Sequence, residues 1–314
     1  MPDPITRDAI EATAQKIAPY VRRTPVMDVT ISGVALPVSL KLELFQHTGS
    51  FKARGAFSTV IGRDIPKAGL AAASGGNHGA AAAYAAHVAG VPAHIFVPAI
   101  ASPAKVARIK SYGAIIDQDG ATYYNALEKC NRFIAETGAL SVHAYDAVPT
   151  LLGQGTLGRE IEQQLPEIDT LLVAVGGGGL IGGIAGWYRG DVRIVGVEPE
   201  TCNTLHASLS AGDRVTVKPS GIAADSLGAS FAGELMFPLA QKFIERVALV
   251  DDEEIRMAQR WLWDHARIIS EPGGATAFAA LLSGAYRPQK DERVCVVLCG
   301  ANTDPETFSK VMIT

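Results

Sequence analysis

Lys52 is the residue of this chain best suited to covalent chemistry, because it lies between glycines and small side chains in the mostly apolar segment Thr48–Gly55. A lysine that loses its hydration there favours the neutral amine, which can attack a carbonyl carbon. The alternative is a lysine whose stem packs while its ammonium group stays in water. Lys52 alone does not decide between these two interpretations.

The glycine run Gly176–Gly179 could hold a phosphate group. It follows the apolar segment 171–175 and precedes a small-residue segment that begins at Leu180. Glycines let several backbone N–H groups converge on an anion, and a following helix adds its positive end. The run lacks the lysine of a Walker A loop and the spacing of a dinucleotide fingerprint, and its apolar flanks argue against a flexible linker. It therefore predicts a phosphate cradle that does not belong to a nucleotide site.

The segment Ser74–Gly79, with the sequence Ser-Gly-Gly-Asn-His-Gly, could hold a carboxylate. It directly precedes the alanine-rich segment 80–89, which is typical of a helix. At a helix start, free backbone N–H groups and the Ser and Asn side chains can donate hydrogen bonds to an anion.

Five ordered motifs extend these observations. They are Ser50-Phe51-Lys52-x-Arg54-Gly55, Ser74-x-Gly76-Asn77-His78, Gly153-Gln154-Gly155-Thr156, the glycine run, and Cys299-Gly300-Ala301-Asn302. Together they resemble the fold type II pyridoxal-phosphate (PLP) enzymes over nearly the whole chain, and within them the serine/threonine dehydratase and serine racemase group. The resemblance implies a tryptophan synthase β-like α/β fold with two domains, each a mostly parallel twisted sheet covered by helices.

The resemblance also implies roles for the motif residues. Lys52 matches the lysine that binds the cofactor covalently and then acts as the base at the α-carbon. The matching cofactor contacts are Gly176, Gly177, Gly178, Gly179 and Leu180 at the phosphate, Asn77 at the phenolic oxygen, Phe51 near the ring face and Cys299 at the pyridine nitrogen. The matching contacts of the substrate carboxylate are Ser74, Gly76, Asn77 and His78. A purely structural role stays open for His78 and Phe51.

Three positions narrow the expected chemistry. Cys299 carries a thiol that is neutral at pH 7, so it cannot keep the pyridine nitrogen protonated as a carboxylate would, and this favours elimination over transamination. The racemases place a serine where this chain has Gly75, so we expect little racemisation and expect Gly75→Ser to raise it. Relatives with a divalent cation use two acids where this chain has Glu198 and Thr204, so we expect no metal.

Composition excludes several other classes. The chain has 314 residues, with 28 basic and 32 acidic ones and no basic block, so we expect no binding to nucleic acid or to a membrane surface. Its four cysteines lack metal-ligand spacing and are typical of reduced thiols, and its first residues lack the pattern of a signal peptide. We expect a soluble, cytoplasmic protein that forms a homo-oligomer, most simply a dimer.

The hydrophobic pattern predicts an alternating α/β chain. A helix is expected over 5–20 and an extended segment over 34–44. Strands are expected at 92–97, 114–117, 171–175, 193–197 and 293–298, and helices at 80–89, 103–112, 121–136, 155–165, 251–269 and 274–283. From the resemblance we expect a large PLP-binding domain of residues 1–54 and 147–314 and a small mobile domain of residues 55–146.

These observations predict a PLP-dependent ammonia-lyase that removes the β-hydroxyl group of L-serine or L-threonine and releases a 2-oxo acid and ammonia. Three alternatives stay open. The substrate could be 3-hydroxyaspartate or another hydroxy amino acid, or the enzyme could be a serine racemase. A protein of another class, which binds an amino acid without catalysis, is the third.

Overall fold

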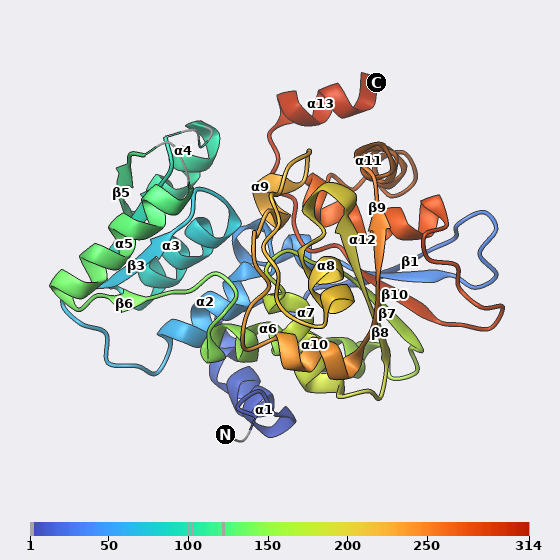
Figure 1. Ribbon diagram of the computed structural model, residues 1–314, viewed down its shortest axis with the longest axis horizontal. Helices are drawn as coiled ribbons and strands as arrows, with labels where there is room; N and C mark the ends of the chain where they lie inside the picture. The colour runs from blue at the N-terminus through green and yellow to red at the C-terminus, as the bar shows by residue number, and fades with distance from the viewer. Residues whose placement is uncertain (1–2, 100, 102, 121–122, 314) are drawn as a thin grey trace.

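The computed structural model describes residues 3–99, 101, 103–120 and 123–313, which form two units built on mostly parallel sheets and lying side by side (Figure 1). Residues 121 and 122, the start of the helix expected over 121–136, lie outside the described residues. Among the described residues, no helix has both the length and the apolar character that crossing a membrane requires.

The larger unit is built on a six-stranded sheet with the order β1-β2-β10-β7-β8-β9. β1 and β2 pair antiparallel, and all other pairs are parallel. Every residue of the central strands β7 and β10 is buried, as expected for parallel strands covered on both faces. The six strands are β1 (Val26–Val29), β2 (Val38–Lys41), β7 (Thr170–Ala174), β8 (Arg193–Pro199), β9 (Ile244–Val250) and β10 (Val294–Val297).

Most helices of the chain belong to this larger unit. Local sequence marks two helix starts, since Thr6 caps α1 and Asp251 with Glu254 forms a capping box on α11. The helices are α1 (Arg7–Ile17), α6 (Val148–Gln164), α7 (Gly179–Tyr188), α8 (Thr204–Ala211), α9 (Ala224–Leu227), α10 (Phe237–Phe243), α11 (Asp252–Ala266), α12 (Pro272–Ser283) and α13 (Pro305–Ile313). Short 3₁₀ turns are η1 (Ala18–Tyr20), η2 (Glu43–Phe45), η3 (His47–Gly49) and η4 (Glu200–Cys202).

The smaller unit is a four-stranded parallel sheet with the order β5-β4-β3-β6. Its strands are β3 (Leu70–Ala73), β4 (Ala93–Val97), β5 (Ile115–Gln118) and β6 (Leu140–Ser141), and its helices are α3 (Asn77–Ala89), α4 (Pro103–Ser111) and α5 (Tyr123–Thr137). The alanines of α3 are almost all buried, because small side chains let the helix approach its neighbours closely. The helix α2 (Lys52–Val60) contacts both α3 and α6 and so joins the two units.

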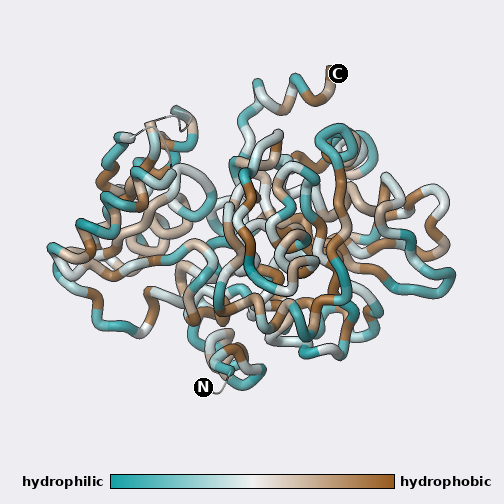
Figure 2. Tube along the Cα trace, in the orientation of Figure 1, coloured by the Kyte–Doolittle hydropathy of each residue, from teal (hydrophilic) through white to brown (hydrophobic). Residues whose placement is uncertain are grey.

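Separate apolar cores stabilise the two sheets. The main core surrounds the six-stranded sheet, and a second core packs α2 and α3 against the smaller one. The peripheral helix α11 carries mostly hydrophilic colours in Figure 2, while hydrophobic colours gather in the interior. The fold is therefore an α/β fold of the expected class.

Every strand and helix that the pattern predicted is present, but it did not predict β1, β3, β6, β9, α2, α8, α9, α10 and α13. The five expected strands correspond to β4, β5, β7, β8 and β10, and the expected helices to α1, α3, α4, α5, α6, α11 and α12. The strand β3 was not predicted, because Leu-Ala-Ala-Ala has little intrinsic preference for a strand and becomes one by pairing with β4 and β6. Nor did the pattern show that Lys52 is the first residue of α2 rather than part of a loop.

Candidate active site

One pocket lies at the edge of the larger sheet where β7 and β10 end. Because parallel strands present their carboxyl ends on the same side, residues that follow different strands meet there. All nine residues expected to contact the cofactor line this pocket, namely Phe51, Lys52, Asn77, Gly176, Gly177, Gly178, Gly179, Leu180 and Cys299. The other lining residues are Tyr145, Ala174, Ile181, Ser226, Leu227 and Glu271.

The glycine run turns sharply from β7 into α7. Gly178 adopts the left-handed backbone conformation with φ of 88°, which a side chain would disfavour. At the start of α7 the first helical hydrogen bond is donated by Gly182 N–H to Gly178 O, at 2.8 Å. The N–H groups of the residues before Gly182 therefore have no acceptor within the helix. A Cβ atom on Gly177 would lie 2.5 Å from the ring of Tyr145. The run therefore forms a narrow cradle whose N–H groups and helix end suit an anion.

Lys52 presents its amine inside the pocket. Its Nζ donates a hydrogen bond to the carbonyl oxygen of Ala144 at 2.8 Å and lies 5.0 Å from the ring centre of Phe51. Burial lowers the pKa of Lys52 to about 8, although negative charge on Cys299 or Glu271 would oppose this shift. At pH 7 about a tenth of this amine is therefore neutral and nucleophilic, far more than for a lysine in water.

Cys299 is buried and lies two residues after the end of β10. Burial raises the pKa of its thiol to about 12, so it is neutral at pH 7. Its Sγ lies 3.5 Å from the carbonyl oxygen of Gly273, and its own carbonyl oxygen accepts from Phe51 N–H at 3.1 Å. This group can accept or donate a weak hydrogen bond, but it does not place a negative charge beside a bound ring.

Asn77 has a fixed side-chain orientation. Its Nδ2 donates to Glu271 Oε1 at 2.6 Å, and its Oδ1 accepts from Asn302 Nδ2, also at 2.6 Å. Asn302 in turn donates to Thr48 O at 2.8 Å and accepts from Arg108 on α4. Burial raises the pKa of Glu271, while the hydrogen bond from Asn77 lowers it. This series of hydrogen bonds links the smaller sheet unit to the pocket.

The residues expected to bind a substrate carboxylate lie at the start of α3. Of the four, only Asn77 lines the pocket, while Ser74, Gly76 and His78 are close to Asn77 in the sequence. The first turn of α3 leaves N–H groups without helical acceptors, since Ala80 N–H is the first to bond, to Gly76 O at 3.1 Å.

The side chain of His78 fits the structural alternative better than a carboxylate contact. Its Nε2 lies 2.7 Å from Val142 O, and a carbonyl only accepts, so Nε2 carries the proton. Burial lowers the pKa of His78 to about 3, and Nδ1 is then an acceptor with no proton to offer a carboxylate.

Glu198 acts as a helix cap. Its two carboxyl oxygens accept hydrogen bonds from Leu205 N–H and His206 N–H, each at 2.8 Å, at the start of α8. Thr204 donates its hydroxyl proton to Ala229 O at 2.6 Å. Within the described ranges, no group of three or more His, Cys, Asp or Glu side chains has the arrangement of a metal site.

Sequence reasoning did not find Ser226 and Leu227, which line the pocket from α9. It also missed the contact between Lys105 on α4 and Asp225, which joins the two units near the pocket. No local motif marks these residues, because they reach the pocket through the packing of distant segments.

The pocket combines a buried amine of lowered pKa, a glycine cradle for an anion and a neutral thiol. These groups fit an aldehyde that carries a phosphate and an aromatic nitrogen, which defines a PLP-binding α/β enzyme. The chain belongs to the family of pyridoxal-phosphate dependent enzymes, whose sequence profile matches residues 17–300. Pyridoxal phosphate is its cofactor.

Three similar proteins narrow the class. The chain is 37% identical to phenylserine dehydratase from Ralstonia pickettii, over 96% of this chain and 94% of that one. It is 36% identical to L-threonine ammonia-lyase from Geobacter sulfurreducens, over 96% and 77%. The solved structure of maize serine racemase superposes with a TM-score of 0.91 at 34% identity, over 98% and 97%. The chain is therefore similar to dehydratases, ammonia-lyases and racemases, and these comparisons leave its substrate open.

Proposed function

We propose that the protein is an ammonia-lyase that removes the β-hydroxyl group of L-serine or L-threonine and yields a 2-oxo acid and ammonia. The observation that carries the proposal is that Lys52, the glycine cradle and the neutral thiol of Cys299 meet in the same pocket. When bound, pyridoxal phosphate supplies the electron sink for the α-carbon of an amino acid.

The chain's own residues have defined tasks in this proposal. The N–H groups of Gly179 and Leu180 bind the phosphate end, and the start of α3 receives the substrate carboxylate. Lys52, once released by the substrate amine, takes the α-proton and holds it at Nζ. The neutral thiol of Cys299 limits electron withdrawal by the pyridine ring. Negative charge at the α-carbon is then relieved by loss of the β-group, and long-lived delocalisation of that charge into the ring is disfavoured.

Gly75 supports elimination over racemisation. A Cβ atom on this residue would lie 2.8 Å from Ala101 Cβ and 2.9 Å from Val97 Cγ1, so the loop has little room for any side chain there. Moving a proton to the opposite face of the α-carbon needs an acid on that face, whereas elimination does not.

A second candidate substrate is a β-aryl hydroxy amino acid. Tyr145 lines the pocket, and its ring lies 5.2 Å from that of His143. An aromatic wall of this kind suits a phenyl side chain. The similarity to phenylserine dehydratase supports the same candidate.

The test is a 2-oxo acid assay on purified enzyme with the D and L forms of serine, threonine, 3-hydroxyaspartate and phenylserine. We expect pyruvate from L-serine and 2-oxobutanoate from L-threonine, no turnover by Lys52→Ala, and borohydride labelling of Lys52 alone. Labelling of another lysine, or D-serine formed as fast as pyruvate, would contradict the proposal. Faster turnover of phenylserine than of both small substrates would select the second candidate.

The proposal also covers the domains of the enzyme, its oligomeric state and its compartment. We propose that residues 55–146 form a small mobile domain that closes over the pocket, and that the enzyme is a cytoplasmic homodimer. Size-exclusion chromatography with light scattering measures the mass of the oligomer, and a dimer should have twice the 33.0 kDa of one chain.

A further inference from the structure

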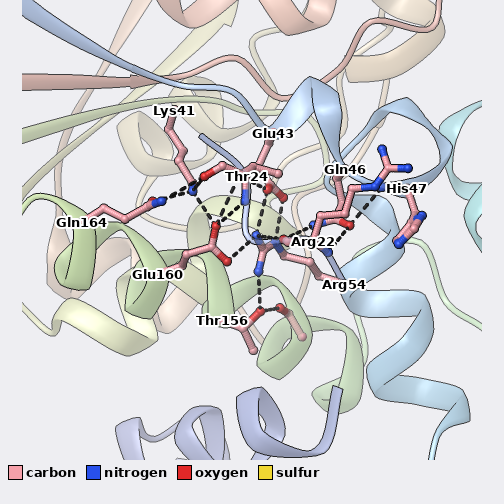
Figure 3. Close-up of polar contacts among 11 residues, drawn as sticks. Arg22, Thr24, Lys41, Glu43, Gln46, His47, Arg54, Thr156, Glu160 and Gln164 are labelled. Carbon is pink, nitrogen blue, oxygen red and sulfur yellow. Dashed lines mark hydrogen bonds and ion pairs between the residues drawn. The ribbon is translucent and has the colours of Figure 1, made fainter. Parts of the chain in front are cut away.

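Four charged side chains form a buried cluster next to α2, which we call the Arg54 cluster (Figure 3). Lys41, Glu43, Arg54 and Glu160 are 0%, 0%, 1% and 9% exposed, and their two positive and two negative charges balance. Arg54 Nε donates to Glu43 Oε2 at 2.7 Å, and Nη2 donates to Glu43 Oε1 at 2.8 Å and to Glu160 Oε2 at 2.9 Å. Lys41 Nζ donates to Glu160 Oε1 at 2.5 Å and to Thr24 O at 2.7 Å.

The cluster joins three neighbouring elements of the segment 38–60 to the helix α6, which lies about a hundred residues further along the chain. Lys41 ends β2, Glu43 begins η2, Arg54 lies in the first turn of α2 and Glu160 lies in α6. Removing four charges from water is costly, and apolar side chains of similar size would often give equal or greater stability. Stability alone therefore does not account for the cluster, whereas a bidentate guanidinium holds its partners in one specific geometry.

The geometry of α2 connects this cluster to the active-site lysine. Lys52 and Arg54 are two residues apart, and a helix turns by about 100° per residue, so their side chains leave α2 on roughly opposite sides. Lys52 reaches the pocket and Ala144 O, while Arg54 reaches Glu43 and Glu160. A rotation of α2 about its axis that broke the bonds of Arg54 would also turn the amine of Lys52 away from the pocket.

The ion pair between Glu43 and Arg54 also closes the segment that leads into α2. This segment contains Thr48 with φ of 63° and Gly49 with φ of 72°, two consecutive residues in the left-handed region. Non-glycine residues adopt this conformation only where the surrounding structure imposes it. The segment is held to the end of β10 as well, by Phe51 N–H to Cys299 O at 3.1 Å.

We propose that Arg54, held between Glu43 and Glu160, is a positioning residue that sets the rotation of α2 and thereby places Nζ of Lys52 against the glycine cradle. The inference rests on the role of Lys52 given under Proposed function. Lys41 and Thr24 complete the cluster by holding Glu160 in place.

The test compares Arg54→Lys with Arg7→Lys. Both changes keep the positive charge and remove a guanidinium group. Arg7, however, pairs with Glu162 near the surface, where the two side chains are 41% and 34% exposed. A third variant, Leu262→Ala, removes a buried side chain of α11 and serves as a control for lost stability alone. Glu43→Gln keeps the shape of the cluster and replaces Arg54→Lys if that variant does not fold.

Four quantities are measured on each variant: the cofactor Kd, the pH midpoint of the bound cofactor's absorbance, the lysine labelled by borohydride, and kcat with KM. For Arg54→Lys or Glu43→Gln we expect at least a tenfold rise in Kd, a shifted pH midpoint and at least a tenfold fall in kcat with KM within twofold. The Arg7→Lys and Leu262→Ala proteins should keep the wild-type midpoint and stay within twofold in Kd.

Two results would overturn the inference. One is an Arg54→Lys protein that keeps the wild-type midpoint and Kd, whether or not it loses stability. The other is a Leu262→Ala protein that changes both quantities as much as Arg54→Lys does. Borohydride labelling separates failure of this inference from failure of the role proposed for Lys52. If only the inference fails, the label stays on Lys52; if the role of Lys52 is wrong, the label is found on another lysine.

Discussion

Replacement of Lys52 by methionine should stabilise the cofactor-free protein at neutral pH. Burial lowers the pKa of this lysine from 10.5 to about 8, so at pH 7 folding must bury an ammonium group that the unfolded chain keeps in water. Each tenfold change in proton affinity is worth about 1.4 kcal/mol, so the cost is of order 3 kcal/mol. The lost hydrogen bond to Ala144 O offsets about 1 kcal/mol, which leaves a net gain of about 2 kcal/mol for Lys52→Met.

The stability difference between Lys52→Met and wild type should depend on pH in one direction. Between pH 8 and pH 10.5 the unfolded chain binds more protons at this site than the folded one, so wild-type stability rises with pH in that window. The advantage of Lys52→Met is therefore full below pH 8 and disappears as the pH approaches 10.5. Below pH 8 both states are protonated, and the cost is constant.

Urea unfolding of the cofactor-free proteins at pH 6, 7, 8, 9 and 10 measures the effect. The matched control is Lys290→Met, which removes an exposed lysine from the loop after α12 and should change stability by less than about 0.5 kcal/mol at every pH. A Lys52→Met protein that is no more stable than wild type at pH 7, or whose advantage does not shrink between pH 8 and 10, would refute the reasoning.

Three further predictions concern the chemistry. Treatment with EDTA should leave turnover within twofold, because the Glu198 carboxyl caps α8 instead of facing a second acid, and a large loss restored by Mg²⁺ or Ca²⁺ would contradict this. The Gly75→Ser enzyme should form D-serine no faster than wild type by chiral chromatography, since its Cβ would meet both Ala101 and Val97, and Ala101→Gly together with Val97→Ala should be needed beside it to raise racemisation. The Cys299→Ser enzyme should keep its dehydratase rate within about tenfold, because both groups are neutral at pH 7, whereas Cys299→Asp should lower it more strongly.

The prediction for Gly75→Ser shows where tertiary structure changes an expectation from sequence. From the motif alone, a serine at this position should supply the acid that racemisation needs. The small sheet brings the end of β4 and Ala101 against the loop, so the position has little space for a side chain. Motif matching identified the position, but only the packing of a segment more than twenty residues away shows what fits there.

The sequence by itself determined the features that depend on local chemistry. The glycine run, the apolar strands β7 and β10, and the alanine-rich helix α3 follow from residue types and spacing, and five ordered motifs identified the family and its cofactor. Each of these signals lies within about ten consecutive residues. Nearby residues settle such features because backbone freedom, strand preference and helix preference are local properties.

Only the tertiary structure decided how those residues are held and charged. It brings Glu160 to Glu43 and Arg54 from more than a hundred residues further along the chain, and it lowers the pKa of Lys52 by removing water from its amine. It also makes Glu198 a helix cap and His78 a neutral donor to a carbonyl group. These properties arise from burial and from partners that are distant in the chain, which local sequence does not contain.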